Sequence, residues 1–277
     1  MFADLMTLTD EGGDVLIAPP APDKGERLYG GQFLAQSVRA AQATTTTDRV
    51  VNALHGYFMR PGDVDAPIEM QVERLRDGRT FSTREVRARQ SGKVLFQATI
   101  SFQVPDETPE YAGSALPEVP PPDAVHGTYD DFTLAVSGET DWHGRDRPID
   151  IRYINPPTAE RGVPVTEDQL MWTRIRTTLP DDPALHLAGL AYLSDATLVD
   201  HIMLPLGKRW QDKDFAGTSL DHCMWFHRPT RSDEWLLFRQ SVDATGRGRG
   251  LARGRFYAAD GTLVATCMQE GLMRWLA

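Results

Sequence analysis

Two segments of the chain have the apolar pattern of a helix, and each is followed by a series of β-prone runs. In Gly30–Ala43 few residues are β-branched and apolar groups stand at Phe33, Leu34 and Val38, which predicts a helix with one apolar side. Ala184–Asp195 is the matching helix of the second half. The predicted strands are Val50–Met59, Ile68–Arg76, Thr80–Gln90, Lys93–Gln103, Ser219–His227, Glu234–Asp243, Leu251–Ala258 and Thr262–Glu270.

A stretch rich in proline and acidic residues, Pro105–Pro122, has no apolar period and is typical of a linker. The halves that it separates share sequence. Tyr57–Pro61 (YFMRP) matches Trp225–Pro229 (WFHRP), and the hairpin glycine Gly92 matches Gly261, with offsets that differ by one residue. We therefore predict two copies of one module, at residues 1–104 and 128–277, joined by a linker at 105–127.

In each module one helix would cover one face of an antiparallel meander, because a sheet must bury one of its faces. This is the hotdog arrangement. The predicted fold class is α+β, a double hotdog in which two antiparallel sheets are each wrapped around a long helix and fused as a pseudo-dimer.

Composition narrows the function classes. Hydrophobic residues make up 41% of the chain, enough for a substantial core, and the longest apolar runs are too short for a membrane-spanning helix. The N-terminus shows no signal-peptide pattern, so we expect a cytoplasmic protein. Cys223 and Cys267 lack metal-ligand spacing, which predicts neither a zinc site nor a disulfide framework.

The formal net charge of −10 argues against nucleic acid as a partner. Arginines nevertheless crowd the segment 247–255, where they either steer a phosphorylated small molecule or protect an exposed strand edge. On the first interpretation Arg247 and Arg249 are candidate substrate-binding residues.

Four strings, in order along nearly the whole chain, resemble the signatures of type II (TesB-like) acyl-CoA thioesterases. They are Tyr29–Gln32 (YGGQ), Leu54–Asp63 (LHGYFMRPGD), Ser219–Pro229 (SLDHCMWFHRP) and Gln269–Gly271 (QEG). The resemblance implies a double-hotdog enzyme that hydrolyses acyl-CoA without a cofactor and assembles into homo-oligomers. By motif matching it implies a catalytic set of Asp195, Ser219 and Gln269, with serine where some members have threonine.

Those three residue types suit the hydrolysis of a thioester by water. A carboxylate can take a proton from water, while a hydroxyl and an amide hold that water in place. We predict Asp195 as general base, Ser219 and Gln269 as positioning groups, and no acyl-enzyme. Backbone N–H groups at the Gly30-Gly31 helix start are candidates for stabilising the oxyanion. His55 is a further candidate for substrate binding, although a histidine in an apolar strand is more often structural.

Each residue of the set also has a structural interpretation. Asp195 is placed to cap a helix, Ser219 to bond its own backbone and Gln269 to bridge strands. Two other functions fit the fold. An acyl-CoA hydratase or dehydratase would use an Asp/His pair, and Asp200-His201 lies past the helix end. A non-catalytic acyl-CoA-binding module would have lost the polar set. Motifs of serine hydrolases, phosphate-binding loops and zinc proteases are missing.

Overall fold

The computed structural model describes residues 1–21, 28–112, 116–137 and 147–276. The elements of the first half are α1 (Phe2–Leu5), β1 (Thr9–Gly12), β2 (Val15–Ala18), α2 (Gly30–Ala43), β3 (Val50–Phe58), β4 (Ile68–Asp77), β5 (Phe81–Gln90) and β6 (Lys93–Gln103). Those of the second half are η1 (Pro122–Ala124), α3 (Tyr129–Ser137), β7 (Ile149–Tyr153), β8 (Gln169–Ile175), α4 (Pro183–Ser194), η2 (Val199–Leu206), β9 (Phe215–Ser219), β10 (Asp221–Phe226), β11 (Leu236–Gly246), β12 (Arg249–Tyr257) and β13 (Leu263–Trp275).

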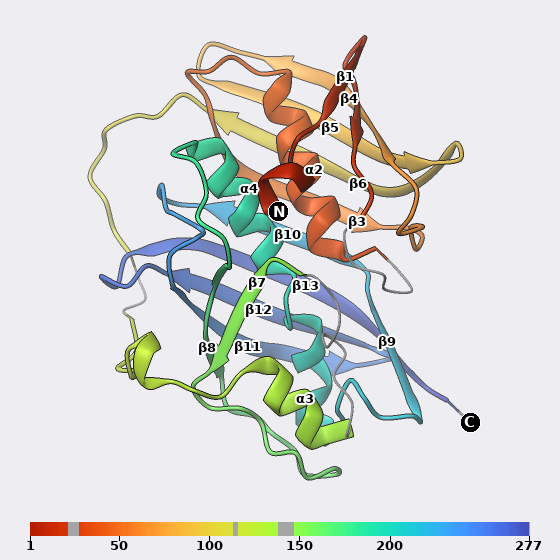
Figure 1. The fold of residues 1–277 in the computed structure, drawn as a ribbon, viewed down its shortest axis with the longest axis vertical. Helices are drawn as coiled ribbons and strands as arrows, with labels where there is room; N and C mark the ends of the chain where they lie inside the picture. The colour runs from red at the N-terminus through yellow and green to blue at the C-terminus, as the bar shows by residue number, and fades with distance from the viewer. Residues whose placement is uncertain (22–27, 113–115, 138–146, 277) are drawn as a thin grey trace.

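The sheets of the two halves join edge to edge into one antiparallel sheet. Its strand order is β1-β2-β4-β5-β6-β3-β10-β13-β12-β11-β8-β7, and β9 pairs with the far end of β13. The junction is the pairing of β3 with β10, in which Cys223 lies opposite His55. Figure 1 shows the strands of the first half above this junction and the strands of the second half below it. The α+β prediction is confirmed, and the continuity of the sheet is a feature that the sequence did not reveal.

Helices α2 and α4 lie side by side and antiparallel inside the curve of this sheet (Figure 1). At one end the Tyr29 hydroxyl donates to the Tyr192 carbonyl at 2.9 Å. Near the other end Arg39 contacts Asp182, the N-cap residue of α4, at 3.4 Å. The segment Pro183–Leu206 is apolar and long enough to cross a membrane, but 94% of its most apolar window is buried inside the protein. Such burial is what the core helix of a folded domain requires.

Several elements were not predicted. The short strands β7 and β8 were not predicted, because five to seven residues between proline- and charge-rich segments show little alternation of their own. Both strands nevertheless belong to the second half of the sheet. The single strand predicted at Ser219–His227 is interrupted at Leu220, so β9 and β10 pair with different parts of β13 and β10 also pairs with β3. Within the described part of 104–121 there is no helix or strand, and the module boundaries stay a prediction.

Candidate functional site

The structure brings Asp195, Ser219 and Gln269 into one hydrogen-bonded cluster. The Gln269 amide nitrogen donates to Asp195 Oδ1 at 2.6 Å and to Ser219 Oγ at 2.9 Å. Asp195 is the C-cap of α4, Ser219 ends β9, and Gln269 lies in β13. Because β9 pairs with β13 at Ser219 and Gly271, the hydroxyl reaches the amide two residues along the partner strand. The catalytic role of these residues stays a prediction.

The start of α2, from the other half of the chain, completes the cluster. The Gly31 N–H donates to Asp195 Oδ2 at 2.8 Å, and the positive end of the α2 dipole faces this carboxylate. A Cβ atom at Gly30 would lie 2.6 Å from Asp195 Oδ2, and one at Gly31 would lie 2.4 Å from the Tyr192 carbonyl oxygen. Glycine is therefore required by close approach at both positions. The Gly31 amide that we considered for an oxyanion is directed to Asp195 instead.

Burial raises the pKa of the Asp195 carboxyl above 3.8, while the hydrogen bonds from Gln269 and Gly31 act in the opposite direction. Burial dominates because a carboxylate loses its hydration there, whereas two neutral donors restore only part of that stabilisation. The result is a carboxylate that accepts a proton more readily than an exposed one, as a general base should.

A cavity of about 400 Å³ opens beside the cluster, at the junction of the two halves. Its lining residues are Leu28, Gly30, Phe33, Phe58, Met59, Arg60, Pro61, Thr218, Ser219 and Leu220. Its size is in the range of small-molecule sites. Ser219 and Gly30 form part of the wall, and Asp195 and Gln269 lie directly behind them. The approach to the cluster is therefore lined mainly by apolar side chains, with Arg60 and Thr218 as the polar side chains besides Ser219.

Three predicted substrate-binding residues lie away from the cluster. His55 is exposed and its ring packs edge-on against Trp225 at 5.1 Å, on the opposite face of β3 from the buried Leu54. Arg247 occupies the β11–β12 hairpin turn with φ of 53°. Arg249 is exposed and forms an ion pair with Glu270 at 3.0 Å. A role for any of them in binding the substrate stays a prediction.

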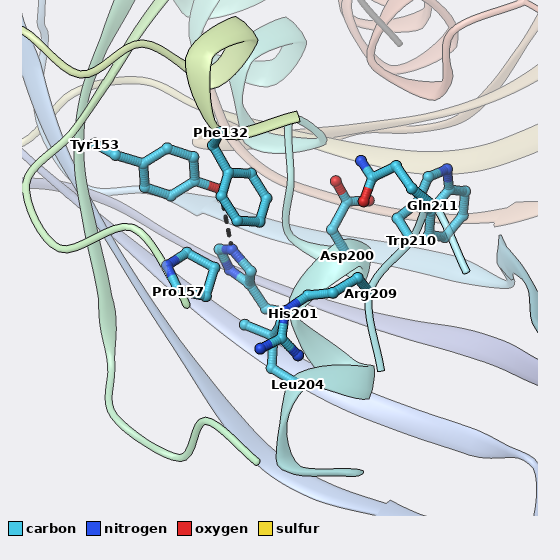
Figure 2. A pocket seen from close by; sticks show the side chains of 9 residues that line it. All are labelled: Phe132, Tyr153, Pro157, Asp200, His201, Leu204, Arg209, Trp210 and Gln211. Atoms are coloured by element: carbon cyan, nitrogen blue, oxygen red, sulfur yellow. Dashed lines mark hydrogen bonds between the residues drawn. The ribbon is translucent and has the colours of Figure 1, made fainter. Parts of the chain in front are cut away.

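The Asp200-His201 pair, which a hydratase would need, is divided between two partners. The Tyr129 hydroxyl donates to Asp200 at 2.7 Å, whereas His201 lies 3.3 Å from the Tyr153 hydroxyl. Figure 2 shows the His201 ring directed at Tyr153 in a pocket of about 10 Å³, room for little more than one water. Burial lowers the pKa of His201 to about 3. This pair is therefore enclosed and has no space for an acyl chain.

A second cavity, of about 340 Å³, occupies the equivalent place in the repeat. It is lined by Val50–Asn52 and by the second copy of the repeated motif, including Phe226, Arg228 and Pro229. Arg228 makes an ion pair there with Glu110 of the predicted linker at 2.7 Å. The chain thus carries two related cavities, of which one adjoins the cluster.

Arg60 is a residue that sequence analysis did not select. It lies on the wall of the cavity that contains Ser219, is exposed, and donates to the Val94 carbonyl at 2.7 Å. Within the described ranges it forms no ion pair, in contrast to Arg228. The internal repeat could have drawn attention to Arg60, because Arg60 and Arg228 are the matched arginines of its two copies.

Comparison with known proteins gives one consistent family. Residues 147–272 match the description "Acyl-CoA thioesterase" and residues 17–103 match "Acyl-CoA thioesterase N-terminal domain". Acyl-coenzyme A thioesterase 8 of Homo sapiens is 36% identical over 263 residues, which cover 90% of this chain and 81% of that protein. Acyl-CoA thioesterase 2 of Haemophilus influenzae is 33% identical over 271 residues, covering 95% and 93%. The crystal structure of acyl-CoA thioesterase II TesB2 from Mycobacterium marinum has a TM-score of 0.82 at 34% identity and covers 100% of this chain and 99% of its own.

Proposed function

Because the chain belongs to the type II, TesB-like acyl-CoA thioesterase family, we propose that it hydrolyses fatty acyl-CoA to a free fatty acid and CoA. The reaction needs a nucleophile for the thioester carbonyl and a place for the negative charge that develops on its oxygen. The first requirement is assigned to residues of this chain.

Water is the nucleophile in this proposal. Asp195 takes a proton from a water molecule at the wall of the 400 Å³ cavity, and the resulting hydroxide attacks the carbonyl carbon. Ser219 and Gln269 fix the position of that water, and no acyl group is transferred to Ser219. The thiolate of CoA leaves when the tetrahedral intermediate collapses. Protonated Asp195 then gives its proton to the thiolate, which restores the base, and the carboxylic acid loses its proton to solvent.

The observation that carries this assignment is the double contact of Gln269 with Asp195 and Ser219. An amide has no proton to transfer at neutral pH, so its role in such a cluster is to orient its neighbours. Among the residues that the structure describes, no histidine lies between this carboxylate and the Ser219 hydroxyl. A serine nucleophile needs an adjacent base, most often a histidine, to activate it. The arrangement therefore favours an activated water over an activated serine.

Substrate orientation follows from the cavity wall. Phe33, Phe58 and Met59 supply an apolar surface for a chain of methylene groups. Arg60 is exposed at the same wall and carries a charge suited to a phosphate of CoA. In this proposal Arg60 holds the coenzyme, in preference to the more distant Arg247 and Arg249.

The experiment is continuous measurement of free CoA thiol from acyl-CoA substrates of graded chain length. We expect release by the wild-type protein and loss of release with Asp195→Asn. Mass spectrometry of protein quenched during turnover should find no acyl adduct. Absence of CoA release at every chain length would leave the non-catalytic binding module as the function, and an acylated Ser219 would overturn the water mechanism.

The proposal also covers the location, assembly and division of the chain. The chain works in the cytoplasm, assembles into homo-oligomers, and divides into modules at 1–104 and 128–277 with a linker between them. Cell fractionation, light scattering on the purified protein and limited proteolysis within 105–127 test them in turn.

A further inference from the structure

The orientation of the Gln269 amide is a problem that the cluster leaves open. Its nitrogen serves Asp195 and Ser219, so its oxygen must point away from both. That oxygen is buried and has no hydrogen-bond partner within the described residues. If the amide turned over, its oxygen would face the Asp195 carboxylate, and the hydrogen bond to Asp195 would be lost. A donor on the far side of the amide would prevent this.

His222 lies at the position where such a donor is needed. In the pairing of β10 with β13, Cys223 lies opposite Met268 and Met224 opposite Cys267, so the next step of the register sets His222 opposite Gln269. Both side chains are fully buried, and directly opposed residues of antiparallel strands project to the same face about 5 Å apart. His222 Nδ1 is itself a buried nitrogen without a partner among the described residues.

The surroundings of the two ring nitrogens of His222 together decide which tautomer is present. His222 Nε2 lies 2.9 Å from Ser194 Oγ, whose hydroxyl proton reaches either this nitrogen or the Ala191 carbonyl oxygen at 2.8 Å. Burial lowers the pKa of His222 to about 3, and the contact with Gln269 opposes this shift. A neutral ring carries one proton. In the Nε2–H tautomer, the lone pair of Nδ1 would face the lone pairs of the Gln269 amide oxygen, and both groups are buried. The Nδ1–H tautomer avoids this repulsion.

The first module supplies an internal control. The repeat aligns His222 with Leu54 and Gln269 with Ile100, and Leu54 and Ile100 are indeed opposed in the pairing of β3 with β6. The residue before the helix C-cap is Ser194 in the second module and Ala43 in the first. The second module thus has a histidine and its serine partner beside Gln269. The first module has no glutamine there, and apolar residues replace both the histidine and the serine.

On these grounds we propose that His222 is a positioning residue of the thioesterase site. Its neutral Nδ1–H donates to the Gln269 side-chain oxygen and holds the amide nitrogen toward Asp195 and Ser219, while Ser194 donates to Nε2. His222 acts through Gln269 and touches neither water nor substrate. This inference rests on the proposed function, because the orientation of Gln269 has a kinetic effect only if the cluster hydrolyses a thioester.

Two variants of His222 separate positioning from packing. His222→Leu introduces the residue that the first module has, and kcat should fall about 10- to 100-fold with KM changed less than about twofold. His222→Asn keeps an N–H close to the Nδ1 position, and it should restore kcat to within about threefold of wild type. His227→Leu, in the same strand region but exposed, is the matched control and should leave kcat unchanged.

Long-range ¹H–¹⁵N NMR of the wild-type protein reads the tautomer directly and does not require any variant to fold. We expect the Nδ1–H form for His222. The Nε2–H form would overturn the inference, as would a folded His222→Leu protein with wild-type kcat or a His222→Asn protein as slow as His222→Leu. If the wild-type protein released no CoA, the proposed function would fail. The NMR measurement would still show whether His222 donates to the Gln269 oxygen.

Discussion

The same place in the two modules adjoins a cavity in each, but only the second module has a polar cluster there. The repeat sets Val51 where Ser219 stands and Ile100 where Gln269 stands, and the helix C-cap is Thr44 in the first module and Asp195 in the second. On the neighbouring strand, Arg84 lies opposite Ile100, whereas Ala252 lies opposite Gln269. One module thus combines a small residue with a polar cluster, and the other combines a large cation with an apolar wall.

In the first module, the side chain of Arg84 occupies the end of helix α2. Its side chain is almost fully buried and donates to Thr44 Oγ1 at 3.0 Å, to the Thr44 carbonyl at 3.1 Å and to Asp77 at 2.7 Å. The end of α2 is therefore closed by a guanidinium with fixed partners. The end of α4 has instead a carboxylate beside a cavity. One copy of the module supplies rigidity and the N-terminus of α2, and the other supplies the polar groups.

Of all the substitutions, removing the general base Asp195 of the second module should have the largest effect on kcat. With Asp195→Asn we expect kcat to fall about 10³-fold with little change in KM, since a general base acts in the transition state. Steady-state release of CoA measures it. Asp182→Asn changes a carboxyl at the opposite end of α4, where asparagine also caps a helix, and should leave kcat at the wild-type value. Equal losses in the two variants would remove Asp195 from its role.

Closing the approach of α2 to Asp195 should have the next largest effect. In Gly30→Ala the new methyl group would meet Asp195 Oδ2 at 2.6 Å, so the carboxylate must move and kcat should fall about 10²-fold. Gly246→Ala is the control, because a Cβ there has no atom within 4 Å. A Gly30→Ala protein with unchanged kcat would show that this contact is not needed for turnover.

The pH dependence of kcat should show the raised pKa of Asp195. The base is active when deprotonated, so kcat is retained at higher pH and falls about tenfold per pH unit below the pKa. Because burial raises this pKa, the acid limb should lie above 3.8. A pH–rate profile of the wild type, compared with Ser219→Ala, measures it. The limb should keep its position in the variant, and a limb at or below the ordinary aspartate value would contradict the assignment.

The two arginines of the repeat should differ in their effect on KM. Arg60→Gln removes an exposed charge beside the cavity of Ser219, and KM for acyl-CoA should rise about fivefold. Arg228→Gln removes a charge that Glu110 already neutralises at the other cavity, and KM should stay within about twofold. Initial rates at low and high salt check both, since only the Arg60 effect should shrink with added salt. A larger change with Arg228→Gln would move the coenzyme to the other cavity.

The smallest effect on activity should come from the first module. Arg84→Met removes the guanidinium from its buried partners, and the free energy of unfolding should fall by about 3 kcal/mol while kcat stays within about twofold. Urea denaturation and the CoA assay on the same preparation measure the two quantities. The control Arg87→Met removes partly exposed ion pairs with Glu73 and Glu85 and should cost about 1 kcal/mol. A large loss of kcat in a folded Arg84→Met protein would mean that the first module contributes chemistry.

The sequence by itself determined the repeat, the two core helices and most of the long strands. These features depend on local pattern. Apolar spacing identified Gly30–Ala43 and Ala184–Asp195, and paired turn glycines identified the hairpins at Gly92 and Gly261. The motif resemblance gave the family, which the comparisons confirm, and named Asp195, Ser219 and Gln269 as candidates.

Only the tertiary structure decided how these pieces meet. The joining of β3 to β10 and the contact of Gly31 with Asp195 link residues far apart in the chain, and local pattern holds no information about such distances. For the same reason sequence pattern assigned His222 no role in the site, while the strand register sets it opposite Gln269. Hydrogen bonds and close packing depend on tenths of an ångström, and residue order becomes geometry of that precision only when the whole sheet has formed.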